Sequence, residues 1–389
     1  MKLILISIGI LLMQMTGWIP PEDQNPEDLT PEEIADEMIR EYDFSELNRQ
    51  LQSVSGLETM NFEDLTELLL QGDIGINSGN IKGIGQLLYR WFLSELDANR
   101  FVMVKLFALA VFMAVFTNLN SASSQAGVSE NGFYVTYLVM SVLLLAAYQT
   151  MYDLAYTAFE DLLKIMSALV PVYITAVGYS SGITSATVME DSLILGMTLI
   201  SEAVRRWIMP VIHLYFALGM MDQLMKRDFF SRLSDLLSVS VSWILKSILA
   251  LTVGLNTIKS MLAPAVDSVT AAAFQRGLQI IPGGDTAAMM SGVVIGSSVL
   301  IKNAIGAGGM CVLVMAVSTP VLKLTVIVFM YKMLEAMLQP VADVRMIKGL
   351  QVVDRSGQML LSVLLAEIVL FLLSIAVIAG HTNMNYYVG

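Results

Sequence analysis

The stretch LLSVLLAEIVLFLLSIAVIAG, residues 360–380, decides the fold of this chain. It carries a single charge, Glu367, and it is long enough to cross a bilayer, which takes about 20 apolar residues as a helix. Comparable runs fill the chain from Phe101 onward. We place candidate spans at residues 101–119, 133–152, 162–181, 192–221, 239–262, 286–338 and 360–380. The sequence therefore predicts an all-α, polytopic helical membrane protein with about eight spans, give or take two.

Two of these stretches are irregular. Residues 192–221 are interrupted by Glu202-Ala-Val-Arg-Arg206, and residues 286–338 are long enough for two spans plus a re-entrant piece. If both termini face outside, the number of spans is even, which favours dividing 192–221 into two short helices. The positive-inside rule places two basic loops in the cytoplasm, those with Lys226, Arg227 and Arg232 and with Arg345, Lys348 and Arg355.

Composition leads to the same class of protein. Of 389 residues, 56% are hydrophobic and only 14% are charged, which is too few to coat a soluble protein of this size. Residues 20–75 hold 16 of the 34 acidic side chains, so the rest of the chain is nearly neutral. Cys311 is the only cysteine and the chain has two histidines, so we expect no disulfide within the chain and no zinc or haem site.

The N-terminal part divides into two segments. Residues 1–19 resemble a signal sequence, with a short apolar run after Lys2, although an uncleaved anchor is the alternative because no A-x-A site is visible. Residues 20–80 form an acidic segment with helix-start signals at Thr30-Pro-Glu-Glu33 and at Asn61. We predict a small extracytoplasmic helical segment, with a solvated acidic spacer as the alternative.

The remaining chain divides again near residue 100. Residues 81–99 place apolar side chains on one helical face, which is typical of an amphipathic helix lying in the membrane interface. Residues 100–389 then form the multi-span membrane domain.

Motifs for catalysis are absent or incomplete. Tyr152-Asp153 and Gly283-Gly284-Asp285 invite comparison with membrane aspartyl proteases, but the match fails at Pro282. The sequence contains no H-E-x-x-H or P-loop pattern. Gly178-Tyr-Ser-Ser-Gly182 has the spacing G-x-S-x-G, but we interpret its small residues as a place where helices pack closely. We therefore predict that the protein is not an enzyme and needs no cofactor or metal.

Small residues and embedded polar residues mark the candidate site. Glycines allow close helix packing in lipid, either within the chain or between subunits around a pore. A charge at bilayer depth must pair, face water or reach the interface, and pairing of Glu367 with one of the embedded lysines is one of these options. The candidate pore or subunit-contact residues are Lys302, Asn303, Gly292, Gly296, Gly306, Gly308, Gly309 and Glu367.

The stretch 267–284 alternates apolar and polar residues and then reaches a Pro-Gly-Gly turn. It is a segment outside the bilayer core that either gates a channel mouth or connects two spans. The candidate turn or gate residues are Asp267, Pro282, Gly283, Gly284 and Asp285.

This region also carries a family resemblance. Asp267-Ser-Val-Thr, Ile281-Pro282 with its glycine pair, and Ser298-Val-Leu-Ile-Lys302-Asn303-Ala-Ile-Gly306 resemble the signature of the stage III sporulation protein AE family. The signal-like run, the acidic segment and the Pro-Val spans fit the same family, so the resemblance covers essentially the whole chain. The Pro-Gly-Gly turn is shorter than the Pro-x-x-Gly turn expected for the family.

The resemblance implies a channel or platform component of the secretion complex that joins mother cell and forespore during endospore formation. The implied partners are the other stage III A proteins, including a separate ATPase, and the forespore-side stage II Q channel protein. We expect a homo-oligomer in the lipid of the mother-cell membrane around the forespore, with an extracytoplasmic N-terminal segment and no nucleic-acid partner. A secondary transporter with a midplane substrate site and a non-conducting scaffold are the alternatives.

Overall fold

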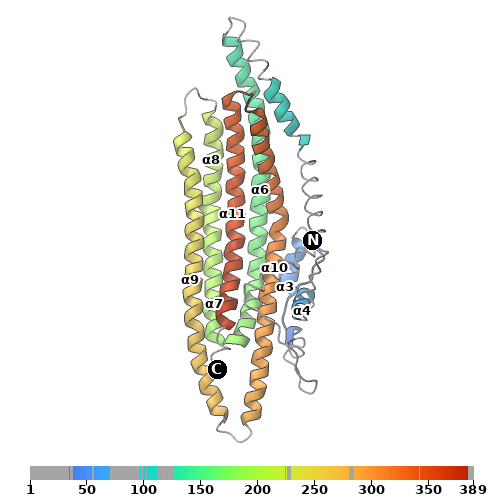
Figure 1. The fold of residues 1–389 in the computed structure, drawn as a ribbon, viewed down its shortest axis with the longest axis vertical. Coiled ribbons are helices and arrows are strands. Elements are labelled where there is room, and N and C mark those ends of the chain that lie inside the picture. Colours follow the sequence, from blue (N-terminus) through green and yellow to red (C-terminus); the bar gives the residue numbers. More distant parts are fainter. Residues whose placement is uncertain are drawn as a thin grey trace.

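The computed structural model describes residues 35, 38–54, 57–70, 97, 100, 101, 103–112, 115 and 126–383, apart from 224, 226–228, 280–283 and 341. Every regular element among them is helical, which confirms the predicted all-α fold (Figure 1). In chain order they include α3 (Ser45–Ser53), α4 (Phe62–Leu70), α6 (Ala126–Ser181), α7 (Ile183–Ala203), η1 (Val204–Ile208), α8 (Met209–Asp222), α9 (Ser231–Gln279), α10 (Gly284–Leu338) and α11 (Val344–Asn383).

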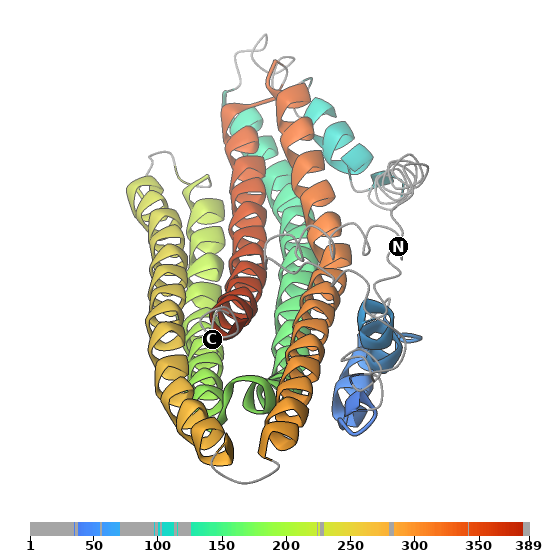
Figure 2. The same cartoon turned by 60° about the horizontal axis from the view of Figure 1, so that its bottom comes forward.

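The long helices run side by side as a bundle of rods (Figures 1 and 2). Helix α11 packs against α6, α9 and α10 and also touches α7 and α8, so it lies at the centre. The most apolar 18 residues of α11 have the highest mean hydropathy among the four candidate spans, and half of them are buried within the protein. The stretch that decides the fold from the sequence is therefore also the core of the bundle.

Four described helices are long and apolar enough to cross a membrane: Tyr134–Ser181, Ser231–Lys259, Gly296–Leu338 and Val344–Gly380. A shorter apolar helix covers Met103–Phe112. The 48 residues of Tyr134–Ser181 measure about 72 Å as a straight helix, more than twice the ~30 Å hydrocarbon core. Helices of this length extend beyond the hydrocarbon core.

Several predicted span boundaries are wrong. The spans at 133–152 and 162–181 belong to the single helix α6, and residues 286–338 lie in the single helix α10 with no re-entrant break. The polar residues between the two predicted spans of α6 include no glycine or proline, so nothing there ends the helix. Pro171 and Pro320 lie inside these helices, as neighbouring helices permit in membrane proteins.

The predicted division of 192–221 into two short helices is also wrong. Helices α7 and α8 join through the π-helical turn η1 into one rod, which reverses against α6 at Gly182. Gly182 adopts φ 108°, a conformation that a side chain disfavours. A glycine here lets α6 end and α7 return along it.

Two described helices of the acidic N-terminal segment, α3 and α4, pack on the bundle (Figure 1). Helix α3 lies against α6, and α4 lies against α10. Asn48 of α3 joins the two, since its Oδ1 accepts the backbone N–H of Phe62 at 2.8 Å and so caps the start of α4. The signal-like residues 1–19 and nearly all of the predicted interfacial helix at 81–99 lie outside the described residues.

Candidate functional site

Three predicted glycines lie where helices approach closely. An added Cβ at Gly309 of α10 would lie 2.5 Å from Leu169 Cδ2 of α6, and one at Gly306 would lie 3.1 Å from Tyr173 Cε2. At Gly308 the nearest atom would be Phe62 Cζ of α4, at 3.2 Å. These glycines therefore serve packing within the chain, the first of the two roles expected from the sequence.

Lys302 and Asn303 lie on α10, one turn before these glycines. Lys302 is fully buried inside the single chain, and Asn303 is half-buried. Gly296 is half-buried, and Gly292 lies in α10 without a described side-chain environment. Lys302 thus faces no opening in a single chain.

The candidate turn is only partly described. Asp267 lies in α9, and Gly284 and Asp285 begin α10, whereas Pro282 and Gly283 fall outside the described residues. The turn therefore connects α9, which contains the amphipathic stretch, to α10.

Glu367 lies at the centre of α11 with an exposure of 0%. Neither carboxylate oxygen has a hydrogen-bond partner among the described residues. Among the described residues, no lysine donates a hydrogen bond to Glu367.

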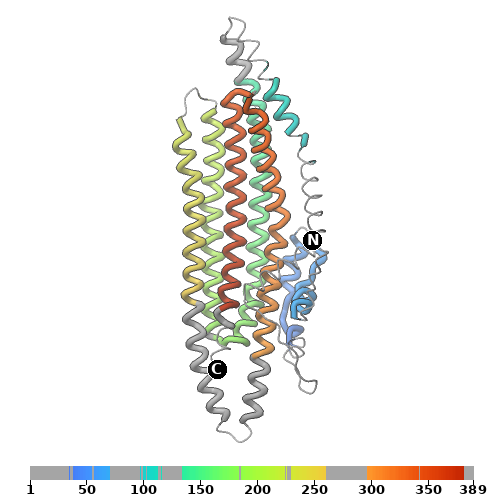
Figure 3. Tube along the Cα trace, in the orientation of Figure 1, coloured from blue at the N-terminus to red at the C-terminus, as the bar shows by residue number. Residues whose placement is uncertain are grey.

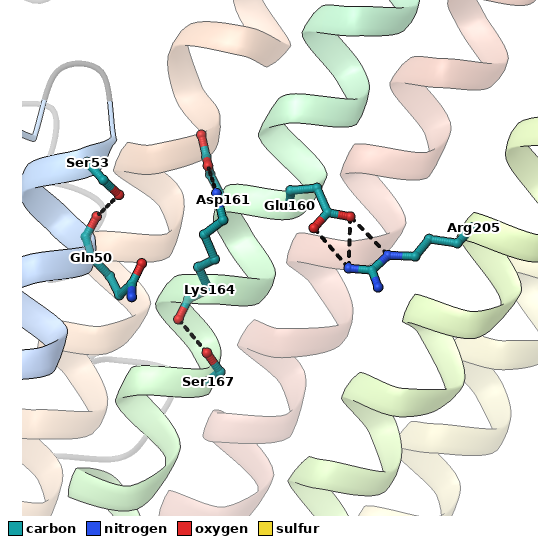
Figure 4. Close-up of polar contacts among 7 residues, drawn as sticks. All are labelled: Gln50, Ser53, Glu160, Asp161, Lys164, Ser167 and Arg205. Atoms are coloured by element: carbon teal, nitrogen blue, oxygen red, sulfur yellow. Dashed lines mark hydrogen bonds and ion pairs between the residues drawn. The ribbon is translucent and has the colours of Figure 1, made fainter.

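Glu160 is held by Arg205 of η1 (Figure 4). Arg205 Nε donates to Glu160 Oε1 and Nη2 donates to Oε2, both at 2.9 Å. This two-bond geometry fixes both side chains and directs the guanidinium to Glu160. A carboxylate of α6 and a guanidinium of η1 thus form an ion pair between the two elements.

The π-helical turn η1 positions Arg205. Pro210 follows two residues after its end, as the second residue of α8. Proline lacks an N–H and its ring clashes with the carbonyl four residues earlier, here that of Arg206. A π turn accommodates this disruption without ending the rod, and such turns occur frequently at functional sites. Arg206 pairs with Glu202 one turn back, so only Arg205 faces α6.

A polar stripe on α6 leads to the ion pair. Tyr148, Tyr152, Tyr156 and Glu160 recur every fourth residue and so share one helical face. The Tyr148 hydroxyl bonds His213 Nδ1 of α8, and the rings of Tyr152 and His213 are 4.2 Å apart. The stripe therefore faces the rod of η1 and α8 along several turns.

Figure 3 shows the path of the chain, which runs from α6 through α7 and α8 to α9, α10 and α11.

No group of three or more His, Cys, Asp or Glu side chains among the described residues is arranged to hold a metal ion. Glu367 is a buried acid without a hydrogen-bond partner among these residues.

Comparison with known proteins bears on the whole bundle. The sequence profile of the stage III sporulation protein AE family matches residues 60–382. The chain belongs to the stage III sporulation protein AE family. Stage III sporulation protein AE of Bacillus subtilis (strain 168) is 25% identical over 300 residues, which cover 77% of this chain and 75% of that protein. No solved structure matches the chain.

The region that matches the family contains α4 and the long helices from α6 to α11, and with them Glu160, Arg205 and Glu367. Of these three, the sequence pointed to Glu367 alone. The spacing of Tyr148, Tyr152, Tyr156 and Glu160 was a usable signal, and so was the pair of arginines before Pro210. Neither signal tells which residue of a neighbouring helix lies opposite these side chains, because that depends on the register between the helices.

Proposed function

We propose that the protein is a non-enzymatic channel or platform component of the secretion complex between mother cell and forespore. Membership of a sporulation protein family over residues 60–382 carries this proposal. The helical membrane bundle and its polar residues at helix contacts support a role within the membrane. A separate ATPase, other stage III A proteins and the forespore-side channel protein are the proposed partners, and the proposed site is the mother-cell membrane around the forespore.

The two ends of the bundle support a proposed orientation. The basic residues Arg232 and Arg345 begin α9 and α11, which run parallel, so both lie at one end. Tyr42 of the N-terminal segment contacts Tyr179 near the end of α6, away from these residues. With the basic end in the cytoplasm, the acidic segment faces the space between the two membranes.

A secondary transporter is the second candidate, and one observation favours it. The ion pair of Glu160 and Arg205 lies at the helix irregularity η1, and Glu367 is buried in α11, and transporters share such features. In contrast, a pore lined by Lys302 requires rearrangement of the chain, because Lys302 is fully buried.

Purified full-length protein separates these functions. Its oligomeric state and its conductance in lipid bilayers are measured, and crosslinking in sporulating cells identifies neighbours. A conducting ring linked to other stage III A proteins supports the channel, and ion-coupled uptake by a monomer supports the transporter. A stable assembly that neither conducts nor transports supports the non-conducting scaffold.

The role of Lys302 is tested in cells that lack the chromosomal gene. Lys302→Met keeps most of the side-chain volume and removes the charge. If Lys302 acts in transport, this variant accumulates in the membrane and assembles normally, but it restores few heat-resistant spores. Full restoration removes Lys302 from the candidate residues, and Lys323→Met on the same helix is the matched control.

A further inference from the structure

A stripe of accessible side chains runs along one face of α11, although the other faces of this helix are buried in the bundle. The accessible positions are separated alternately by four and three residues, so they follow one another along one side of the helix. Starting near the basic end, the stripe contains Gln351, Arg355, Gln358, Ser362, Leu365 and Val369. The stripe is therefore polar near the basic end and apolar farther along α11.

Arg355 of the stripe lies beside a second cation, Lys332 of α10. Gln351 Nε2 donates to Glu335 Oε1 of α10 at 2.6 Å, and this bond fixes the register of the two antiparallel helices. About one turn farther along, Arg355 and Lys332 lie at the same level. Both side chains are exposed, and neither forms an ion pair with a carboxylate in the part of the chain that the structure describes.

The carboxylates close to these cations already have other partners. Glu335 accepts the bond from Gln351, and the buried Asp354 accepts a bond at 2.8 Å from Gln358 Nε2 to its Oδ2. The bond from Arg355 Nη1 to Gln358 Oε1 is long, at 3.5 Å. The guanidinium of Arg355 and the ammonium of Lys332 are therefore available to an anion outside the chain.

An exposed tryptophan indicates the depth of this stripe in the membrane. The Asn256–Ser374 bond, at 2.7 Å, aligns the parallel helices α9 and α11. An equal number of residues before these two partners, Trp243 of α9 lies level with Leu361 of α11. Trp243 is 72% exposed, and exposed tryptophans favour the boundary between headgroups and acyl chains. This boundary then coincides with the change from polar to apolar residues in the stripe.

We propose that the stripe, together with Lys332, binds an anionic phospholipid from the leaflet at the basic end of the bundle. The lipid phosphate accepts hydrogen bonds from Arg355 and Lys332, and a guanidinium suits phosphate because it offers two parallel donors. The acyl chains lie along Leu365 and Val369, which are 43% and 38% exposed. Basic positions between helices on the cytoplasmic side of membrane proteins bind anionic headgroups in this way. The site does not depend on whether the assembly conducts.

Native mass spectrometry counts the lipid molecules that stay bound to each chain. The full-length protein in a mild detergent is titrated with dioctanoyl-phosphatidylglycerol, which is anionic, or with dioctanoyl-phosphatidylcholine, which has no net charge. Glycerol phosphate supplies the phosphate group without acyl chains. The proposal predicts saturable binding of phosphatidylglycerol and much weaker binding of the other two compounds.

Two variants test where the lipid binds. Arg355→Gln and Lys332→Gln should each raise the dissociation constant for phosphatidylglycerol about fivefold, because each removes one basic contact with the headgroup. Lys164→Gln is the matched control, since Lys164 of α6 already pairs with Asp161 at 3.1 Å. This control should leave the dissociation constant unchanged.

Equal binding of the two lipids by the unaltered protein overturns the preference for an anionic lipid. Equal binding of glycerol phosphate overturns the role of the acyl chains, and a dimer that carries no phosphatidylglycerol assigns the stripe to a second copy instead. None of these three results requires a variant to fold. Equal affinity of the unaltered protein and Arg355→Gln overturns the location on α11.

Discussion

At the scale of single residues, Gly309 sets how closely α10 approaches α6. Three atoms of Leu169 lie within 3.3 Å of the position that a Cβ would take, so even alanine forces a neighbour to move. Gly254 of α9 has no atom within 4 Å of that position. Gly309 is therefore needed for close packing of two helices, whereas Gly254 leaves room for a side chain, although both lie in apolar helices.

We predict that Gly309→Ala lowers the free energy of unfolding by about 1–3 kcal/mol through overpacking. Gly254→Ala is the matched control and is expected to raise it by up to about 1 kcal/mol through helix propensity. Thermal unfolding in a mild detergent measures both. Equal effects of the two changes would show that α6 and α10 do not pack as described.

Between elements, Phe62 anchors the acidic segment to the bundle. Its ring is buried, faces Gly308 of α10 and lies 5.4 Å from the ring of Phe44. Phe62→Ala is expected to cost about 3–5 kcal/mol and to release α4 from α10. Limited proteolysis of membranes should then cut this segment faster, whereas Leu68→Ala, at a residue 44% exposed, should not change the rate. Unchanged proteolysis of the Phe62 variant would contradict the docking of α4.

A buried amide fixes α9 to the central helix. Asn256 Nδ2 donates to Ser374 Oγ of α11 at 2.7 Å, and both residues are buried. We expect Asn256→Ala to cost about 1–3 kcal/mol, because it leaves the hydroxyl of Ser374 without this partner.

The double replacement Asn256→Ala with Ser374→Ala should cost less than the sum of the single changes. Chemical unfolding of the unaltered protein, the two single variants and the double variant measures the coupling energy between Asn256 and Ser374. Additive effects would indicate that the two side chains do not interact.

At the scale of the whole molecule, bare apolar surface surrounds the bundle. Helix α9 faces outward most, since only 22% of its apolar window is buried. Exposed side chains such as Leu138 of α6, Trp243 of α9 and Phe329 of α10 form a surface suited to lipid. The bundle therefore needs a membrane on its sides and water at its ends.

Orientation is testable with a single reactive thiol per molecule. Cys311 is the only cysteine and is buried, so Cys311→Ala provides a thiol-free background. Ser53→Cys on α3 and Ser231→Cys at the start of α9 are matched changes at exposed positions. In intact vegetative cells that express the protein, where this side of the membrane faces the medium, a membrane-impermeant maleimide should label Ser53→Cys and leave Ser231→Cys unlabelled until the cells are opened. The reverse pattern would invert the proposed orientation.

The sequence by itself determined the class of fold, because long apolar runs admit only helices in lipid and the acidic residues gather before residue 75. It also led to the family, through motifs around Lys302 and Pro282. It did not determine where helices end, since the polar residues between apolar runs in α6 and α7 resemble loop residues but contain no helix breaker.

Only the tertiary structure decided which polar groups meet. Glu160 and Arg205 are far apart in the sequence, and their ion pair depends on the register of α6 and of the rod through η1. Local pattern fixes which face of a helix is polar, but register is set by packing along whole helices, as at Gly309 and Gly357. For that reason the fold was readable from the chain, whereas the environment of Glu367 was not.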